Sequence, residues 1–312
     1  MASKRVSFHV GVRTYDASVF PTAAPLQSPA DDVRAMYNLA NDLGYTPLDL
    51  VSRGPWIGAT PAPPNVLTDT AATYSTVVGL FQSAAALLQK KGDSCFITFS
   101  GHGTQFSNIE IHPTLDGALD EAVCLHDYTL LDDVIYGLLA GFENDVNVLL
   151  VLDCCHAGAT NPSGILESLK KSFDNLFSGK LFRATERVPK RPTPRQSSSP
   201  YGIKKVTKKP VKGPPQLAID LQTQFKDFGR PNLRANVAVF QACGDKEDTF
   251  DGKNPGDLSV YTQKFVSAAR NGATTIGGLK NAIATALPQI TNCTPQFQPE
   301  GDANILATLL KP

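Results

Sequence analysis

The sequence predicts an α/β protein built on a mostly parallel β-sheet that helices cover on both faces. Two observations point to this class. Nearly continuous apolar runs of strand length alternate with segments of helical periodicity along the chain. Within these runs apolar and polar residues do not alternate, which is typical of strands buried on both faces of a parallel sheet. With 42% apolar residues, the 312-residue chain can bury the core that this arrangement needs.

The predicted elements follow one another in that alternating order. A strand at 6–12 precedes a helix that starts at Ser28 and Pro29, an N-cap and a proline at the first helical position, and ends near Gly44. We expect further strands at 47–51, 94–100, 146–153 and 236–242, and further helices at 70–91, 130–142, 261–270 and 276–287.

A basic segment divides this pattern. Residues 178–230 are rich in proline and serine in their first part and show neither helical nor strand periodicity. Eleven of the 29 basic residues, but only one of the 29 acidic residues, lie between 178 and 215. The rest of the chain therefore carries 18 basic and 28 acidic residues. We expect an exposed, largely disordered linker at 178–230 between two structured parts, 1–177 and 231–312.

The composition excludes several classes of protein. The 29 basic and 29 acidic residues leave no global basic excess for binding nucleic acid. Six cysteines without paired C-x-x-C motifs argue against a disulfide framework or a structural zinc site, and they favour a reducing compartment. No uncharged stretch approaches the roughly 18 residues of a membrane span, and the first apolar run is too short for a signal peptide. We expect a cytoplasmic protein that binds neither nucleic acid nor membrane.

Two short segments place reactive residues just past the ends of buried strands. The first is SGHG at 100–103 and the second is DCCHAG at 153–158. Ligands of open parallel sheets bind outside the carboxyl ends of the strands, so both segments are expected to face one crevice. A cysteine that lies near a histidine there can ionise and attack a carbonyl carbon.

Together these two segments resemble the catalytic pair of the metacaspases, the caspase-like cysteine peptidases of fungi, plants and protists. The resemblance extends to the first strand and helix, to GDS at 92–94 and to QAC at 241–243. It implies a caspase-like α/β/α sandwich with a mostly parallel six-stranded sheet flanked by helices. In that fold 1–177 is the large-subunit-like catalytic part, and 231–312 is the small-subunit-like part that completes the same sheet. The resemblance also favours a monomer.

The resemblance identifies Cys155 as the nucleophile and His102 as its base. His102 lies 53 residues upstream of Cys155, which fits the separation in caspase-like enzymes. Gly103 and Cys155 would supply the backbone N–H groups of the oxyanion hole. Cys243 is an alternative nucleophile, because QACG at 241–244 resembles the caspase signature, although Asp245 departs from its last position.

The same resemblance implies specificity for Arg or Lys at P1. The pocket acids map to Asp32 and Asp153, with Ser100 beside them. Asp32 falls in the first turn of a helix that starts at the carboxyl end of the first strand, so it can reach the crevice. An acid in that turn is also favoured by the helix dipole alone.

Calcium is the cofactor that the resemblance implies. Acidic residues gather between 116 and 133, and oxygen-only clusters suit Ca²⁺. The expected ligands are Asp132 and Asp133 together with Asp116 or Asp120. A solvated acidic loop is the alternative interpretation of this segment.

The basic linker is where members of this family cut themselves, and its Lys and Arg residues suit an acidic P1 pocket. We therefore expect the protein itself to be a substrate, beside other proteins with Arg or Lys at P1. Two rival functions remain: a catalytically silent caspase-like scaffold, and an Asp-specific peptidase, which would need an Arg-lined pocket.

Overall fold

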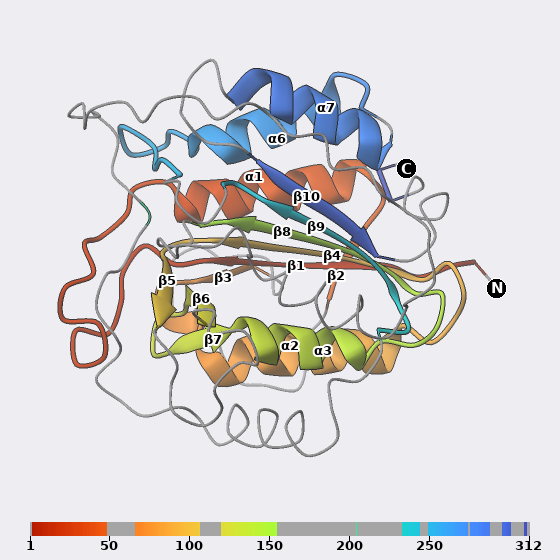
Figure 1. Cartoon of the computed structure of the whole chain (residues 1–312), viewed down its shortest axis with the longest axis horizontal. Helices are drawn as coiled ribbons and strands as arrows, with labels where there is room; N and C mark the ends of the chain where they lie inside the picture. Colours follow the sequence, from red (N-terminus) through yellow and green to blue (C-terminus); the bar gives the residue numbers. More distant parts are fainter. Residues whose placement is uncertain are drawn as a thin grey trace, which may run out of the picture.

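The protein is a three-layer sandwich (Figure 1). A central β-sheet lies between helices α1, α6 and α7 on one side and helices α2 and α3 on the other. The computed structural model describes residues 2–48, 66–106, 120–154, 204, 233–243, 249–273, 275–287, 295–300 and 309–310. Within this part of the chain no helix is both long and apolar enough to cross a membrane.

The main sheet is the mostly parallel sheet that the sequence predicts. Its strands follow the order β10-β9-β8-β4-β1-β2, with the short β3 paired to β1. Among these described strands, only β10 runs antiparallel to its neighbour. The strands are β1 (Arg5–Gly11), β2 (Thr46–Pro47), β3 (Val66–Thr68), β4 (Ser94–Ser100), β8 (Asn147–Asp153), β9 (Asn236–Gln241) and β10 (Gln296–Glu300). Because β9 and β10 come after residue 230, the C-terminal part completes the same sheet.

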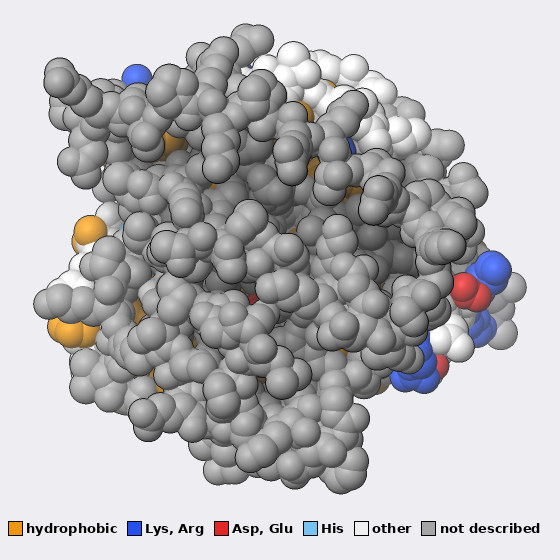
Figure 2. Space-filling view, viewed as in Figure 1, with side chains coloured by type: hydrophobic (Ala, Val, Ile, Leu, Met, Phe, Trp, Pro, Cys, Tyr) orange, Lys and Arg blue, Asp and Glu red, His pale blue; other side chains and the backbone are white. Residues whose placement is uncertain are grey.

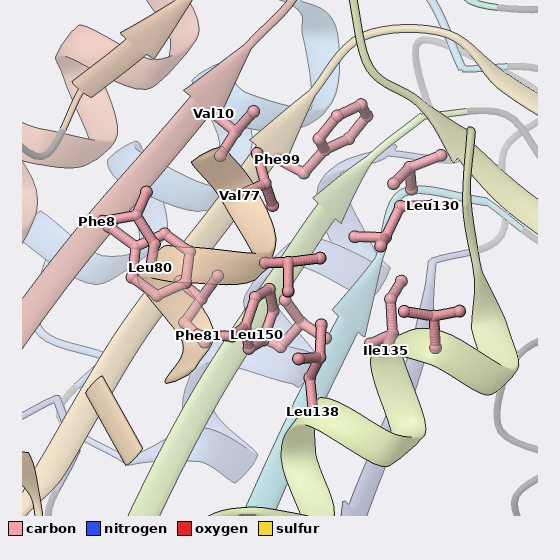
Figure 3. Packing of buried hydrophobic residues seen from close by; sticks show 14 of the residues in the cluster. Phe8, Val10, Val77, Leu80, Phe81, Phe99, Leu130, Ile135, Leu138 and Leu150 are labelled. Carbon is pink, nitrogen blue, oxygen red and sulfur yellow. The ribbon is translucent and has the colours of Figure 1, made fainter. Parts of the chain in front are cut away.

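In the part of the chain that the structure describes, five helices cover the two faces. They are α1 (Pro29–Asp42), α2 (Tyr74–Leu87), α3 (Asp132–Ala140), α6 (Val260–Arg270) and α7 (Ile276–Ala286). Figure 3 shows the packing on the α2 and α3 side, where Phe8 and Leu150 from the sheet meet Leu80, Phe81 and Leu138 from the helices. A second cluster of buried side chains packs α1, α6 and α7 against the opposite face. Every residue of β4 and of β8 is buried, which explains why apolar residues predominate on both faces of these strands and why polar residues occur mainly at their ends.

Several boundaries differ from the prediction. The helix expected at 70–91 starts only at Tyr74, because the Thr73 side chain accepts a hydrogen bond from Thr76 N and caps it. The segment expected as a helix at 130–142 begins as a strand, β7 (Thr129–Leu131). The strand expected at 47–51 ends at Pro47, and residues 49–51 lie outside the described part.

A small antiparallel sheet was not predicted. It comprises β5 (Gly103–Phe106), β6 (Asp120–Cys124) and β7. It starts directly after His102, at the edge where β4 ends. These strands are only three to five residues long, which leaves no apolar run that periodicity could detect.

Candidate active site

The strand register gathers the predicted pocket residues at one edge of the sheet. Ser100, the last residue of β4, pairs with Asp153, the last residue of β8. On its other side Ser100 pairs with Gly11, the last residue of β1. A side chain at Gly11 would come within 2.4 Å of the Pro29 carbonyl oxygen, so glycine lets the start of α1 lie against the strand ends. This close approach brings Asp32, in the first turn of α1, to the same edge.

A lysine fills the pocket that these residues form. Lys204 Nζ lies 3.0 Å from Asp32 Oδ2, 2.9 Å from Ser100 Oγ and 3.2 Å from Asp153 Oδ2. The side chain of Lys204 is fully buried, and those of both aspartates are nearly so. The three acceptors match the three hydrogens of an ammonium group. The expectation that the whole of 178–230 is exposed is therefore wrong at Lys204, because composition cannot show that one lysine of the segment has a buried acidic partner.

The C-terminal part supplies hydrogen-bond donors to both acids. Ser259 donates its N–H to Asp32 Oδ1 at 2.8 Å and its hydroxyl to Asp153 Oδ2. Thr262 donates its hydroxyl to Asp153 Oδ2 at 2.8 Å, and Thr249 donates its own to Asp153 Oδ1 at 3.3 Å. Ser259 is also the N-cap of α6. Both carboxylates are thus oriented by groups that lie beyond the linker in sequence.

A third acid, Asp251, is linked to Asp32 through Ser28. Asp251 is buried and accepts hydrogen bonds from Gln27 N at 2.6 Å and from Ser28 N at 2.8 Å. The Ser28 hydroxyl lies 2.6 Å from Asp251 Oδ1 and 2.8 Å from Asp32 Oδ2, so it links the two acids. Ser28 therefore begins α1 without capping it through its side chain. Sequence reasoning missed four of these residues, because an isolated hydroxyl or acidic residue forms no recognisable motif: Thr249, Asp251, Ser259 and Thr262. The one available signal was the position of Ser259, which suits an N-cap because it directly precedes a helical pattern.

The charges of the pocket favour a bound cation. Burial alone lowers the pKa of Lys204, but the negative charges of Asp153, Asp32 and Asp251 outweigh it, so the pKa of the ammonium group is raised. Burial raises the pKa of Asp32, and the Lys204 charge opposes that shift. Three acids around one lysine leave the pocket with an excess of negative charge.

His102 lies just past the end of β4, and of its two ring nitrogens only Nε2 has a hydrogen-bond partner among the described residues. Its Nε2 lies 2.8 Å from the Ala24 carbonyl oxygen, which can only accept, so Nε2 carries the proton of the neutral ring. Among the described residues the buried Nδ1 has no hydrogen-bond partner. Burial lowers the pKa of His102, so the neutral ring, with its lone pair on Nδ1, is the favoured form. This geometry is that of a general base.

The Lys204 backbone is hydrogen-bonded as well as its side chain. Gly103 N donates to the Lys204 carbonyl oxygen at 3.2 Å, and Lys204 N donates to the Thr249 carbonyl oxygen at 3.4 Å. Gly103 is one of the two predicted oxyanion-hole donors. The Lys204 carbonyl thus meets an N–H group next to His102 while its side chain lies in the acidic pocket.

The structure does not describe every predicted site residue. Cys155 lies outside the described residues, as does Asp116, whereas Asp120 and Asp133 are described only through their backbone. Cys243, the alternative nucleophile, is buried, with its Sγ 3.8 Å from the Cys154 carbonyl oxygen. Asp132 is buried at the start of α3. Among the described residues, no group of three or more His, Cys, Asp or Glu side chains stands close enough to hold a metal ion.

The sandwich, the histidine after β4 and the acidic crevice at the strand ends define a caspase-like α/β protein. The family comparison agrees with this class. The profile of the Caspase domain family matches residues 8–299, so the chain belongs to the caspase-like cysteine peptidases. It is a metacaspase-like member of that family, because two curated metacaspases are similar to it.

These relatives are distant. Metacaspase-6 of Arabidopsis thaliana is 30% identical over 125 residues, which cover 38% of this chain and 34% of that protein. Metacaspase III c of Phaeodactylum tricornutum is 31% identical over 94 residues, covering 28% and 27%. This chain thus matches about a third or less of either relative's length. The solved structure of protein GSU0716 from Geobacter sulfurreducens covers 97% of the chain with a TM-score of 0.63 and 21% identity, which supports the fold alone.

Proposed function

We propose that this protein is a cysteine endopeptidase that cleaves after Lys or Arg and that its first substrate is its own linker, at the bond between Lys204 and Lys205. One observation carries this proposal. Lys204 occupies the acidic pocket with its side chain and meets Gly103 N with its carbonyl oxygen at 3.2 Å. A substrate residue at P1 has to make these same two kinds of contact.

The reaction assigns a role to each group. His102 Nδ1 takes the proton of the Cys155 thiol, and the thiolate attacks the carbonyl carbon of residue 204. The negative charge that develops on the carbonyl oxygen is stabilised by Gly103 N–H. When the peptide C–N bond breaks, His102 returns its proton to the leaving amine of Lys205. Water then hydrolyses the thioester, which regenerates the thiol and releases a carboxylate on Lys204.

The acidic pocket argues for a basic P1 residue and against Asp. A P1 aspartate would place a further carboxylate beside Asp32 and Asp153 in a buried site, which is electrostatically unfavourable. The same pocket makes the uncut chain a zymogen under this proposal, because a buried Lys204 excludes any other P1 side chain. A protein substrate can bind only after the linker leaves.

The test compares self-cleavage in linker variants. The wild type should yield a fragment whose new N-terminus is Lys205, identified by N-terminal sequencing and intact mass. Lys204→Met should lose this cut, and Lys204→Arg should keep it. Lys212→Met removes another linker lysine and should still be cut first after residue 204. A first cut elsewhere, or an unchanged cut in Lys204→Met, would contradict the assignment of this bond.

Peptide substrates test the specificity directly. The processed protein should hydrolyse fluorogenic peptides with Lys or Arg at P1 and leave the Asp peptide intact. Cleavage of the Asp peptide alone would establish the caspase-like specificity instead. No turnover of any peptide by the processed wild type would leave a scaffold role.

We also propose that calcium stimulates this activity. Carboxylate oxygens are the ligands that Ca²⁺ prefers, and Asp132 and Asp133 open α3. In the antiparallel pairing of β6 with β7, Ala122 lies opposite Leu131. Because β6 starts at Asp120 and α3 directly follows β7, this register brings the backbone of Asp120 near the start of α3. This placement supports Asp120 as the further ligand, whereas Asp116 lies outside the described residues.

A calcium titration of the self-cleavage rate tests this second proposal. The doubly substituted variant Asp132→Asn/Asp133→Asn should lose the stimulation. Asp127→Asn is the matched control, because Asp127 accepts a hydrogen bond from Tyr74 N at 2.7 Å and so holds the start of α2. That variant should lose stability and keep its calcium response. An equal response in all three proteins would remove these residues from the site.

A further inference from the structure

Three successive backbone N–H groups around His102 point to three different partners. Gly101 N donates to the Asp153 carbonyl oxygen at 3.3 Å, and Gly103 N donates to the Lys204 carbonyl oxygen at 3.2 Å. Between them, His102 N donates to the hydroxyl of Tyr15 at 2.7 Å. This hydroxyl therefore fixes the peptide plane that joins Gly101 to His102, and the direction of the next N–H group, at Gly103, depends on that plane.

Tyr15 holds its own hydroxyl in place. The hydroxyl donates to the Val12 carbonyl oxygen at 2.9 Å, so its lone pairs are left to accept from His102 N. Burial raises the pKa of the Tyr15 hydroxyl, which therefore keeps its proton and takes no part in proton transfer. A side chain at residue 101 would come within 3.0 Å of this oxygen, so glycine there permits the approach.

The ring of Tyr15 also contacts the imidazole. The two ring centroids lie 5.1 Å apart at an interplanar angle of 34°. On its other side Tyr15 packs edge-on against Phe20, with centroids 5.6 Å apart. Phe20 and Ala24, whose carbonyl accepts from His102 Nε2, belong to the same loop between β1 and α1. That loop therefore holds His102 by its backbone, by its ring face and by Nε2.

We propose that Tyr15 is a positioning residue of the peptidase, which holds both the base His102 and the oxyanion donor Gly103 in their working orientation. The proposal rests on the peptidase function proposed above. Neither the sequence motifs nor the family resemblance points to Tyr15, which lies 87 residues before His102 in sequence. Its effect is expected on the chemical step, because the described hydrogen bonds of Tyr15 are with Val12 and His102, whereas those of the Lys204 ammonium group are with Asp32 and Ser100.

The test removes only the hydroxyl group. In Tyr15→Phe the ring remains but His102 N loses its acceptor, so kcat for a Lys peptide and the first-order rate of cutting after Lys204 should both fall about tenfold. The KM of the peptide should stay within about twofold, because the pocket is untouched. Tyr45→Phe is the matched control, since it removes a buried hydroxyl that donates to the Leu309 carbonyl oxygen at 3.0 Å.

Both variants should lower the thermal midpoint, and only Tyr15→Phe should slow the reaction. A kcat of Tyr15→Phe within twofold of the wild type, or an equal loss in Tyr45→Phe, would overturn the proposal. Alkylation of Cys155 by iodoacetamide, followed by peptide mass mapping, separates this result from failure of the peptidase proposal. If the wild type cleaves nothing, slower alkylation in Tyr15→Phe still supports the positioning role, and an unchanged rate excludes it.

Discussion

Two buried aspartates lie near opposite ends of β4 and differ in the kind of partners that they have. Asp93 precedes β4 and accepts hydrogen bonds from the backbone N–H groups of Lys4, Gln89 and Lys90 at 2.8 to 3.1 Å. Asp32 stands beside the last residue of β4, and its partners there include the hydroxyls of Ser28 and Ser100 and the ammonium group of Lys204.

The two aspartates differ in whether one of their partners can be displaced. The partners of Asp93 are main-chain N–H groups that belong to the fold, so its hydrogen bonds persist as long as the protein stays folded. One partner of Asp32 is a cation from the segment between the two structured parts of the chain, and a substrate lysine could replace it. Under our proposal, Asp32 is a binding group because its cationic partner can be replaced. The predictions below test that distinction from the largest expected effect to the smallest.

Two cysteines give the largest contrast. Cys155→Ala should reduce self-cleavage and peptide turnover by about 10³-fold or more, since it removes the nucleophile that we propose. Cys95→Ala alters a buried thiol of β4. Burial raises the pKa of that thiol, so it is unreactive near neutral pH. Its loss should cost about 1 kcal/mol of unfolding free energy and leave kcat unchanged. Equal activity losses in both variants would break the contrast between the two groups.

The two ends of β4 can be compared by paired acid-to-amide changes. Asp153→Asn removes one of the charges that face a P1 cation, and we expect kcat/KM for a Lys peptide to fall about 100-fold. Asp93→Asn places an amide donor against backbone donors, which should cost about 1–3 kcal/mol of unfolding free energy. Urea unfolding and peptide kinetics of both variants measure the two effects, and a large kcat/KM loss in folded Asp93→Asn would refute the assignment of that end as structural.

The pH dependence of kcat and KM should sharpen the role of Asp32. His102 must be neutral to accept a proton, and burial lowers its pKa, so kcat should fall with acidification through a midpoint below about 6.5. Burial raises the pKa of Asp32, so its carboxylate is lost at a higher pH than usual for Asp. If Asp32 binds the P1 cation as we propose, KM should rise as pH falls through that value. Asp32→Asn should keep the kcat limb and lose the KM limb.

The smallest effect is expected at an exposed ion pair. Lys91 Nζ lies 3.7 Å from Asp145 Oδ2 near the amino end of β4, and the two side chains are 75% and 48% exposed. Figure 2 shows charged side chains gathered on that edge of the molecule. Lys91→Ala should change the unfolding free energy by about 0.5 kcal/mol or less and leave self-cleavage unaffected. A large loss of stability or of self-cleavage would mean that solvent exposure does not distinguish the Lys91–Asp145 pair from the buried Lys204–Asp32 pair.

Much of this site could be predicted because buried strands and their ends leave local patterns in the sequence. Apolar runs located β4 and β8, so Ser100, His102 and Asp153 could be assigned to one edge before any contact was known. The burial of Lys204 could not be predicted, because the composition of its neighbours indicates an exposed linker. The partners of His102 could not be predicted for a different reason. Ala24 contributes a backbone carbonyl, which has no sequence signature, and Tyr15 contributes a hydroxyl from a loop without periodicity.

The pairing of β8 with β9 determines what a cut in the linker would do to the fold. These two strands lie in the middle of the sheet, on opposite sides of residue 204 in sequence, and they pair in parallel from Asn147 opposite Asn236 to Leu152 opposite Gln241. A cut after Lys204 would therefore divide the chain but leave the sheet whole. The two pieces would remain one folded body under native conditions and separate only on denaturation, so the mature enzyme would be a single sheet made of two polypeptides.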